Sequence, residues 1–237
     1  MIYAFIPARS GSTRLNDKNF LNLKGKKLFE WSIEAANKSI KVDKIIFSTD
    51  SKKYIDYMKS VTLEKELIID IRNDENSSSS KKIYDYLCND FLENNNFLKD
   101  DDLILMLLPT QPYRSLQDIN NLVDLCLSSN TNVFSCREYD FPLSFAIEIN
   151  EENNYTSLFS DSPLLTGNTR SQDQKTFFHP DGSIYIVSVN SLKRNYKSIY
   201  ENAIPYIVNR KIYIDIDSEE DFDLALKYGS SVLKDSL

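Results

Sequence analysis

Residues 2–19, IYAFIPARSGSTRLNDKN, place a short apolar run directly before a loop of small and basic residues. The run Ile2–Ile6 predicts a buried strand. Backbone N–H groups around Gly11 can cradle phosphate oxygens, and nearby cations can neutralise their charge. The cations of the loop are Arg9, Arg14 and Lys18. Its spacing matches neither the Walker loop nor the dinucleotide-binding fingerprint, so two interpretations stay open: a triphosphate site and a basic surface loop.

Further apolar runs alternate with helical patterns along the chain. The additional strands that they predict are Lys44–Ser48, Leu67–Ile71, Leu103–Leu108, Asn132–Cys136 and Ser183–Val187. Ser115 and Asp118 form a capping box before one helix, and Ser218 and Asp221 repeat it near the C-terminus. Near-continuous apolar strands alternating with helices indicate an α/β fold whose mostly parallel sheet is covered on both faces. In such sheets ligands bind at the carboxyl ends of the strands.

The composition argues against several classes of protein. The 237 residues fit a single domain, 1–237, with a sizeable core. Lys and Arg total 28 against 35 Asp and Glu, and the net charge of -7 argues against a nucleic-acid partner. The longest apolar run, Leu103–Leu108, is too short to cross a membrane, and no signal peptide is visible. Three cysteines without a CxxC pair fit reduced thiols in a cytoplasmic protein.

The segment 138–175 breaks this rhythm. It is rich in Asn, Ser, Asp and Pro, and it carries one hairpin-like strand, Phe145–Ile149. Loops of this length without structure of their own are uncommon in compact domains. We therefore interpret the segment as an insertion that packs against a second subunit; the alternative is a solvated surface loop.

A pair of carboxylates stands near the C-terminus, in the stretch Tyr213–Asp221. Asp215 and Asp217 alternate on a predicted strand, so both point to one face. Two carboxylates on one face repel each other unless a cation lies between them, and such hard oxygen ligands suit Mg²⁺ together with substrate phosphates. The alternative is that these acids only cap the following helix. Combined with the cationic first loop, they predict a site for a metal-bound nucleotide.

Two further loops supply polar groups. The turn Leu107–Arg114, which contains two prolines, follows a buried strand. It is expected to direct Thr110, Gln111 and Arg114 toward the same cleft as the first loop. The alternative is a turn that only leads into the capped helix. His179 is the only histidine, and no other soft ligands for a zinc site accompany it. Polar side chains around Gly182 can instead bind the hydroxyl and amide groups of a sugar.

In this order and spacing, the four elements resemble the cytidylyltransferases that activate nine-carbon acidic sugars, the CMP-sialic acid synthetase family with its pseudaminic and legionaminic acid branches. The resemblance covers nearly the whole chain. The family's IPARSGSK-like opening is similar to Ile6–Asn19, and its DIDT-like motif matches Asp215 and Asp217. Its QPTSPLR-type turn is similar to Leu108–Arg114, and its NGAIYI-type sugar loop is similar to Asp181–Ile186.

This resemblance implies a three-layer Rossmann-like nucleotidyltransferase fold with a small dimerisation and sugar-site insertion at 138–175. The implied reaction converts CTP and a nonulosonic acid into the CMP-sugar and pyrophosphate, for surface glycan biosynthesis, with Mg²⁺ as the cofactor. The implied partners are these two substrates and a second copy of the chain, with no nucleic acid and no membrane. The implied location is the cytoplasm.

The resemblance also implies roles for the residues that match the family's motifs. The catalytic residues are Arg9, Lys18, Asp215 and Asp217, of which the two aspartates bind the metal. The nucleotide-binding residues are Arg9, Ser10, Gly11, Ser12, Arg14, Lys18, Asn19, Arg72, Ser78 and Ser79. The sugar-binding residues are Gln111, Arg114, Arg170, Gln172, Asp181, Gly182 and Tyr185. Arg170 or Lys175 is a candidate clamp for the sugar carboxylate.

The chain departs from the family pattern where Lys, Gln and Asn are usual. The residues at these positions are Thr13, Leu108 and Asp181. Thr169–Asp173 together with His179 is more similar to the pseudaminic branch, so a pseudaminic- or legionaminic-type sugar is at least as well indicated as N-acetylneuraminate. Two alternatives stay open: a metal-dependent glycosyltransferase that uses Asp215 and Asp217 as a D-x-D motif, and a non-catalytic nucleotide-sugar-binding protein.

Overall fold

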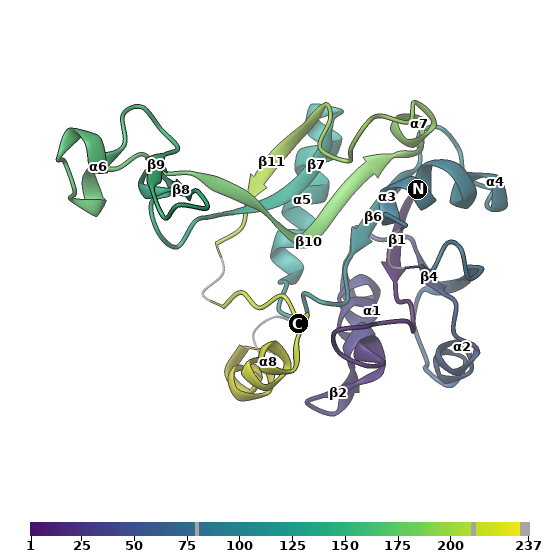
Figure 1. Cartoon of the computed structure of the whole chain (residues 1–237). Helices are drawn as coiled ribbons and strands as arrows, with labels where there is room; N and C mark the ends of the chain where they lie inside the picture. Colours follow the sequence, from purple (N-terminus) through teal and green to yellow (C-terminus); the bar gives the residue numbers. More distant parts are fainter. Residues whose placement is uncertain (79–80, 210–211, 233–237) are drawn as a thin grey trace. The chain divides into compact units, whose positions relative to one another are not determined.

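The computed structural model describes residues 1–78, 81–209 and 212–232, and it divides into two units (Figure 1). The larger unit comprises Met1–Ser135 and Gly182–Leu237, and the smaller unit comprises Cys136–Asp181. The smaller unit encloses the segment 138–175 that interrupts the alternating pattern of the sequence.

The chain forms a seven-stranded sheet with the order β11-β7-β10-β6-β1-β4-β5. Its strands are β1 (Ile2–Pro7), β4 (Lys44–Thr49), β5 (Glu66–Ile71), β6 (Leu103–Leu107), β7 (Asn132–Glu138), β10 (Phe178–Ser188) and β11 (Ala203–Ile207). Strand β1 pairs in parallel with β4 and β6, and β4 pairs in parallel with β5, whereas β10 runs antiparallel to β6. The mostly parallel sheet predicted from the apolar runs is therefore confirmed, and β1, β4, β5 and β6 end at one edge.

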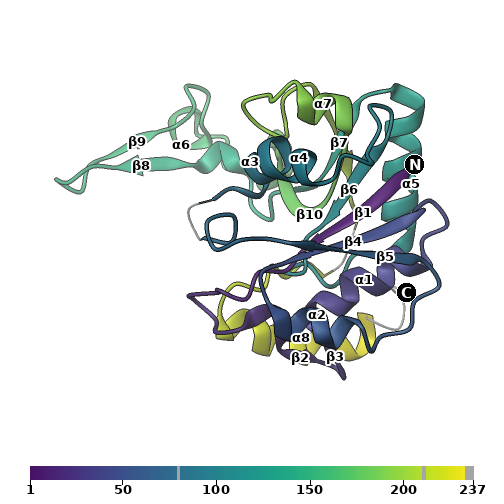
Figure 2. The same ribbon diagram turned by 90° about the vertical axis from the view of Figure 1, so that its right-hand side faces the viewer.

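Helices cover both faces of this sheet (Figure 2). The helices on one face are α1 (Leu28–Lys38), α2 (Lys52–Met58) and α5 (Leu116–Ser129). The helices on the other face are α3 (Ile83–Tyr86), a π-helical turn (Leu87–Phe91), α4 (Leu92–Asn94) and α7 (Val189–Lys193). The helices on each face pack on the sheet through a cluster of buried apolar residues. Because side chains alternate along a strand, β1 contributes Ala4 and Ile6 to the first apolar cluster, with α1, α2 and α5. It contributes Tyr3 and Phe5 to the second apolar cluster, with α3, α4 and α7. The three-layer α/β architecture is confirmed.

A third apolar cluster joins segments from both ends of the chain. Its members are Leu23, Leu28, Trp31, Tyr113, Ile214, Ile216 and Ala225. Ala225 belongs to α8 (Glu219–Val232), which begins at the predicted capping box. The Asp221 N–H donates to Ser218 Oγ (3.2 Å), and Asp221 Oδ2 accepts from the Ser218 N–H (2.8 Å). The cluster holds the residues just before α8 against α1, near the start of the chain.

The predicted strand around Asp215 and Asp217 is wrong. Residues 212–217 belong to no helix or strand. Ile214 and Ile216 are buried in the third cluster, and any extended segment that packs on one side buries alternate residues as a strand does. The Ile216 N–H donates to the Thr110 carbonyl oxygen (2.9 Å). The two carboxylates consequently lie on the side opposite the buried isoleucines, beside the turn that follows β6.

Short elements complete the two units. Those of the larger unit are the 3-10 turn Lys18–Phe20 and the paired strands β2 (Asn22–Leu23) and β3 (Lys26–Lys27). Those of the smaller unit are the 3-10 turns Leu143–Phe145 and Ser171–Asp173, the helix α6 (Pro163–Thr166), and the antiparallel strands β8 (Ile147–Ile149) and β9 (Tyr155–Ser157). The predicted strand Phe145–Ile149 is thus shorter than expected, because Phe145 belongs to a 3-10 turn. Within the described ranges, no helix is both long and apolar enough to cross a membrane.

Candidate active site

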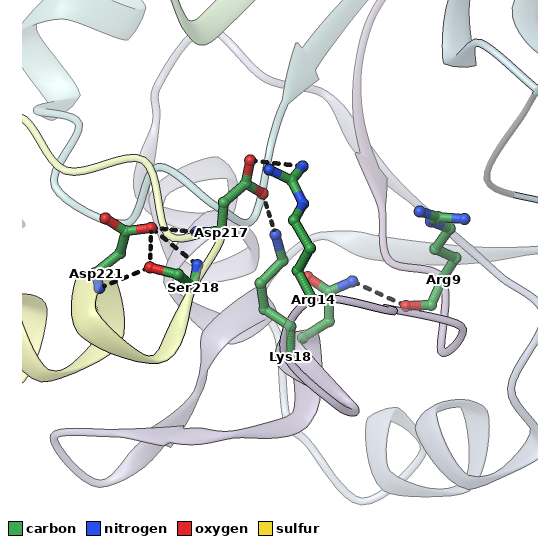
Figure 3. A network of polar contacts seen from close by, with 7 residues as sticks. Arg9, Arg14, Lys18, Asp217, Ser218 and Asp221 are labelled. Atoms are coloured by element: carbon green, nitrogen blue, oxygen red, sulfur yellow. Dashed lines mark hydrogen bonds and ion pairs between the residues drawn. The ribbon is translucent and has the colours of Figure 1, made fainter.

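The first loop, residues 8–19, is fastened to the edge of the sheet where β1 and β4 end. Ser10 donates two hydrogen bonds to the carboxylate of Asp50, from its N–H (2.8 Å) and from its hydroxyl (3.1 Å). The Asn19 side-chain amide donates to the Arg9 carbonyl oxygen (2.9 Å), which closes the loop on itself (Figure 3). Ser10 therefore anchors the loop, and Asn19 fixes its shape before any ligand binds.

Lys18 connects this loop to the acidic residues near the C-terminus (Figure 3). Its Nζ donates to Asp217 Oδ1 (2.6 Å), and the Lys18 side chain is only 10% exposed. Arg14 Nη2 lies 2.9 Å from Asp217 Oδ2, but the Arg14 side chain is 73% exposed. The structure therefore brings these two cations to one carboxylate, and Lys18 and Asp217 lie 199 positions apart in the sequence.

A pocket of about 190 Å³ includes Lys18 in its wall. The residues expected to bind a nucleotide that line it are Arg9, Ser12, Lys18, Asn19, Arg72 and Ser78. Pro7, at the end of β1, and Leu108 and Thr110, after β6, also line it. The pocket therefore lies at the carboxyl ends of the parallel strands, where ligands bind in this architecture.

Three other nucleotide-binding candidates, Ser10, Gly11 and Arg14, do not line this pocket. Ser10 anchors the loop as described, and Arg14 is exposed beside Asp217. Gly11 is exposed, and a Cβ there would meet open space. Ser79 lies outside the described residues. Two larger hollows, of about 890 and 560 Å³, lie where the strands begin and contain none of the candidate residues.

Asp215 and Asp217 have different surroundings. Both oxygens of Asp217 face cations, whereas Asp215 is exposed and accepts a hydrogen bond from Thr110. The protein atoms around the Asp215 carboxyl group and the charge of Asp217 nevertheless raise its pKa, although Thr110 and Lys18 act against them. Asp221 differs again, because hydrogen bonds from Ser218 and from its neighbours' backbone lower its pKa although burial acts to raise it. Asp221 caps α8, and Asp215 and Asp217 are the carboxylates accessible to a ligand.

These two carboxylates fit a divalent cation such as Mg²⁺. Mg²⁺ prefers hard oxygen ligands and usually takes one or two carboxylates together with substrate phosphates and waters. Desolvation first, and the charge of Asp217 to a smaller extent, raise the pKa of Asp215, and a cation bound beside the two carboxylates would favour their ionised forms. Across the described parts of the chain, no group of three or more His, Cys, Asp or Glu could hold a metal ion. Substrate phosphates and waters are the usual remaining ligands of an ion held by two carboxylates.

Arg72 is held rigidly in the pocket wall. Its side chain is buried, and Nη2 donates to the Ser48 carbonyl oxygen (3.2 Å). Its guanidinium carbon lies 5.8 Å from the centre of the Tyr86 ring, and the Tyr86 hydroxyl donates to both oxygens of Asp70 (2.9 and 2.8 Å). Burial lowers the pKa of Arg72 although nearby acids act against it. Because a poorly solvated cation gains from any acceptor it meets, Arg72 is suited to bind an oxygen or ring nitrogen of a ligand.

Sequence reasoning missed two residues of this wall, Asn76 and Lys81. They belong to no recognisable motif, and neither residue type is unusual in a loop. The one available signal was position, because both follow the predicted strand Leu67–Ile71 at the edge of the sheet where ligands bind.

Three of the sugar-binding candidates belong to the larger unit near the turn after β6. Gln111 is buried, and a Cβ on Gly182 would lie 3.9 Å from Gln111 Nε2. Gly182 has a φ of 75°, a conformation that favours glycine. Arg114 is buried and donates to Ser32 Oγ (2.7 Å) and to the Leu108 carbonyl oxygen. In this structure Arg114 therefore holds the turn together, while Gln111 and Gly182 lie side by side.

The other four sugar-binding candidates are divided between the two units. Tyr185 packs in the second apolar cluster, with its hydroxyl 3.1 Å from that of Tyr200. Arg170, Gln172 and Asp181 belong to the smaller unit, where Asp181 is buried and the other two are exposed. Gln172 lines a hollow of about 270 Å³ within that unit. The roles of all seven residues toward a sugar stay predictions.

Most of the chain is similar in sequence to known proteins. A family model described as cytidylyltransferase matches residues 3–183. The N-acylneuraminate cytidylyltransferase of Streptococcus agalactiae serotype V is 29% identical over 220 residues, which are 92% of this chain and 50% of that protein. The pseudaminic acid cytidylyltransferase of Campylobacter jejuni serotype O:23/36 is 24% identical over 222 residues, 93% of this chain and 92% of that protein. The CMP-N,N'-diacetyllegionaminic acid synthase of Legionella pneumophila is 31% identical over 232 residues, 95% of this chain and 94% of that protein.

The chain spans about half the length of the streptococcal relative. Among solved structures, a CMP:2-keto-3-deoxy-manno-octonic acid synthetase complexed with CTP is similar with a TM-score of 0.64 and 16% identity. That similarity covers 100% of this chain and 99% of the other. At this identity the likeness concerns the fold, and it agrees with the three-layer architecture described above.

Proposed function

The chain belongs to the cytidylyltransferase family, and on that premise we propose that it transfers CMP from CTP to a nonulosonic acid and releases pyrophosphate. One observation carries this proposal. Lys18 both lines the 190 Å³ pocket and donates to Asp217 (2.6 Å). The cationic loop and the acidic residues can therefore act on one ligand, as a metal-bound nucleoside triphosphate requires.

In the proposed reaction, the anomeric hydroxyl oxygen of the sugar forms a bond to the α-phosphorus of CTP. The bond from that phosphorus to the oxygen bridging the β-phosphorus breaks, pyrophosphate leaves, and the hydroxyl proton is lost. The residues contribute mainly positioning and charge stabilisation. Arg9 and Lys18 would neutralise phosphate oxygens, and the anchoring of Ser10 and Asn19 would keep the loop in place.

We propose Asp215 and Asp217 as the residues that hold Mg²⁺. When bound, the ion would supply positive charge beside the phosphate oxygens and orient the leaving group. Lys18 and Arg14, which pair with Asp217 in this structure, would then be released toward the phosphates. The chain's own groups thereby exchange partners when the nucleotide and the cation arrive together.

We propose that the sugar is a nonulosonic acid of the pseudaminic, legionaminic or N-acetylneuraminic type. Relatives named for all three sugars match more than nine-tenths of the chain. Thr169–Asp173 and His179 favour the first of these sugars over N-acetylneuraminate, by their similarity to the pseudaminic branch. The described cysteines are free thiols, which supports a reducing compartment, the cytoplasm, as the site of this reaction.

The experiment that tests the activity is a substrate panel. The purified chain is incubated with CTP, Mg²⁺ and each of the three acids, and pyrophosphate release is followed, with EDTA as the control. We expect release with at least one acid and its loss when EDTA removes the cation. Pyrophosphate release with none of the acids would overturn the proposal. Release of CMP or of a nucleoside diphosphate from a nucleotide-sugar donor would instead favour a glycosyltransferase.

We also propose that the smaller unit forms a dimer interface. It exposes many large apolar side chains, among them Phe141, Ile147, Ile149, Tyr155, Leu158 and Leu165, and apolar surface in excess of what a monomer usually exposes marks an interaction site. Ile149 and Tyr155 are partners in the β8–β9 pairing. We expect the double variant I149D/Y155D to sediment as a monomer, while the control Leu127→Asp, on an exposed residue of α5, sediments like the wild type.

A further inference from the structure

One wall of the 190 Å³ pocket, between β5 and α3, contains buried polar atoms that the described residues leave without partners. Asn76 is 6% exposed, and its Oδ1 has no hydrogen-bond partner among the described residues. Arg72 is also 6% exposed, and its Nε has none there. Both residues line the pocket. Since buried polar groups are nearly always hydrogen-bonded, an acceptor and a donor left open in one wall indicate a ligand that supplies both partners.

The orientation of the Asn76 amide is set by its neighbours. The Asn76 side chain hydrogen-bonds to Asp90, in the π-helical turn Leu87–Phe91, and Asp90 also lies 3.1 Å from Lys81 Nζ. An ionised carboxylate only accepts hydrogen bonds, so the Asn76 group that meets it is the NH2. This leaves Oδ1 as the atom without a hydrogen-bond partner among the described residues, so Asn76 has an acceptor to offer a ligand rather than a donor.

The backbone that carries Asn76 is fixed as well. Asn73 Oδ1 accepts from the Asn76 N–H (2.8 Å), and the Asn73 carbonyl oxygen accepts from the Ser77 N–H (3.1 Å). The Ser77 carbonyl oxygen in turn accepts from Arg9 Nη1 (3.2 Å), which ties this turn to the first loop. The acceptor on Asn76 and the donor on Arg72 are therefore both held in place before a ligand enters.

A cytosine ring fits this pair, because it carries an exocyclic amine on C4 beside the ring acceptor N3, and the carbonyl oxygen O2 on the other side of N3 is a second acceptor. Uracil carries a carbonyl oxygen in place of the amine and an N–H at N3, so it would set an acceptor against Asn76 Oδ1. We propose that Asn76 is the residue that selects cytosine over uracil, with Arg72 donating to a ring acceptor and Asp90 as the positioning residue that orients the Asn76 amide. This inference rests on the proposed function and adds to it the residue that reads the base.

The test measures binding of CTP and of UTP to the full chain by titration calorimetry with Mg²⁺, which needs no sugar. We expect Asn76→Ala to weaken CTP binding by about tenfold to a hundredfold, the usual effect of leaving a buried partner unpaired, while UTP binding changes by less than about threefold. We expect Asp90→Asn to let the amide turn over, so that UTP binds more tightly and the preference for CTP falls by about tenfold. Asn89→Ala, on an exposed neighbour of Asp90, is the matched control and should keep the wild-type preference.

The outcomes distinguish a failure of the proposed role of Asn76 from a failure of the proposed function. Equal weakening of CTP and UTP by Asn76→Ala, or a preference for CTP that survives both variants, would overturn the role of Asn76 and leave the proposed function intact. A wild-type chain that binds neither nucleotide would overturn both. Circular dichroism melting of each variant shows whether it is folded, and Asp90→Asn tests the same selection without substituting a residue that lines the pocket.

Discussion

The two ends of the parallel strands use their charged residues differently. Where the strands begin, Asp102 accepts from the Met1 amino group (2.7 Å) and from the Lys99 N–H (2.8 Å), and Asp43 accepts from the Ile2 N–H (2.7 Å). Where the strands end, the pKa of Asp215 is raised, that of Arg72 is lowered, and Asn76 Oδ1 has no partner among the described residues. The first edge is satisfied internally, whereas the second is incomplete without a ligand. Stability and function are thus assigned to opposite edges of one sheet.

The edge where the parallel strands end, which contains the candidate active site, is called the functional edge below. Removing the Asp217 carboxylate is expected to have the largest effect on activity at this edge. We expect Asp217→Asn to lower the rate of pyrophosphate release at least about a thousandfold, because a cation ligand and the partner of Lys18 are lost together. The melting temperature should change little, since the Asp217 side chain is 38% exposed. Asp124→Asn, which removes a surface partner of Lys41, is the control and should remain active. Near-normal rates in Asp217→Asn would remove Asp217 from the site.

The two cations that pair with Asp217 provide a finer comparison. Lys18 lines the pocket and is nearly buried, whereas Arg14 is 73% exposed. Charges in water are screened, so exposed ones contribute little. We expect Lys18→Met to weaken CTP binding by about a hundredfold and Arg14→Gln by less than about tenfold, measured by calorimetry. Equal effects would mean that Arg14 takes an equal part in phosphate binding.

At the opposite edge, Asp102→Asn should cost stability without affecting activity. Burial acts to raise the pKa of Asp102, but hydrogen bonds from Lys99 and from the Met1 amino group outweigh it and lower that pKa. We expect a loss of about 1–2 kcal/mol in the free energy of unfolding at pH 7, with kcat unchanged. A group with a lowered pKa stabilises the fold above its ordinary value, 3.8 here, and loses this effect as the pH falls through the lowered pKa. Urea unfolding at pH 7 and at acidic pH should therefore show the difference vanish in acid.

The smallest expected effect has the opposite sign. Asp215→Asn removes a charge that its surroundings disfavour, while the amide can still accept the hydrogen bond from Thr110. Because Asp215 is exposed, we expect a gain of less than about 1 kcal/mol in the free energy of unfolding at pH 7, accompanied by loss of activity. A stability loss in urea unfolding would contradict the view that the functional edge is strained by its own charges.

Local patterns in the sequence predicted most of the fold. The strands β1, β4, β5, β6, β7 and β10 coincide with apolar runs, and the Ser115 and Ser218 caps begin α5 and α8 as expected. Strand β11 escaped notice because Pro205 interrupts it, and proline is tolerated only where a strand needs no ladder donor. Residues 213–217 were mistaken for a strand because one-sided burial gives the same alternation with or without a sheet.

The candidate site was predictable where residues stand in a recognisable motif, as in the first loop and around Asp217. Asn76 was not, because its significance depends on Asp90, which orients its amide from a separate helical turn. A single sequence records which residues are polar, but it does not record which of them are buried without a partner. That property exists only after the chain has folded.

The bond between Lys18 and Asp217 also has a consequence for synthesis. The ribosome makes a chain from its N-terminus, so β1, its loop and the parallel strands emerge long before the acidic residues that complete the site. A nascent chain can assemble its core, yet it acquires the Asp215 and Asp217 carboxylates only when the residues just before α8 dock against α1. The cationic loop is thus made well before its acidic partner, and a stall in translation between the two would leave Lys18 without the Asp217 carboxylate.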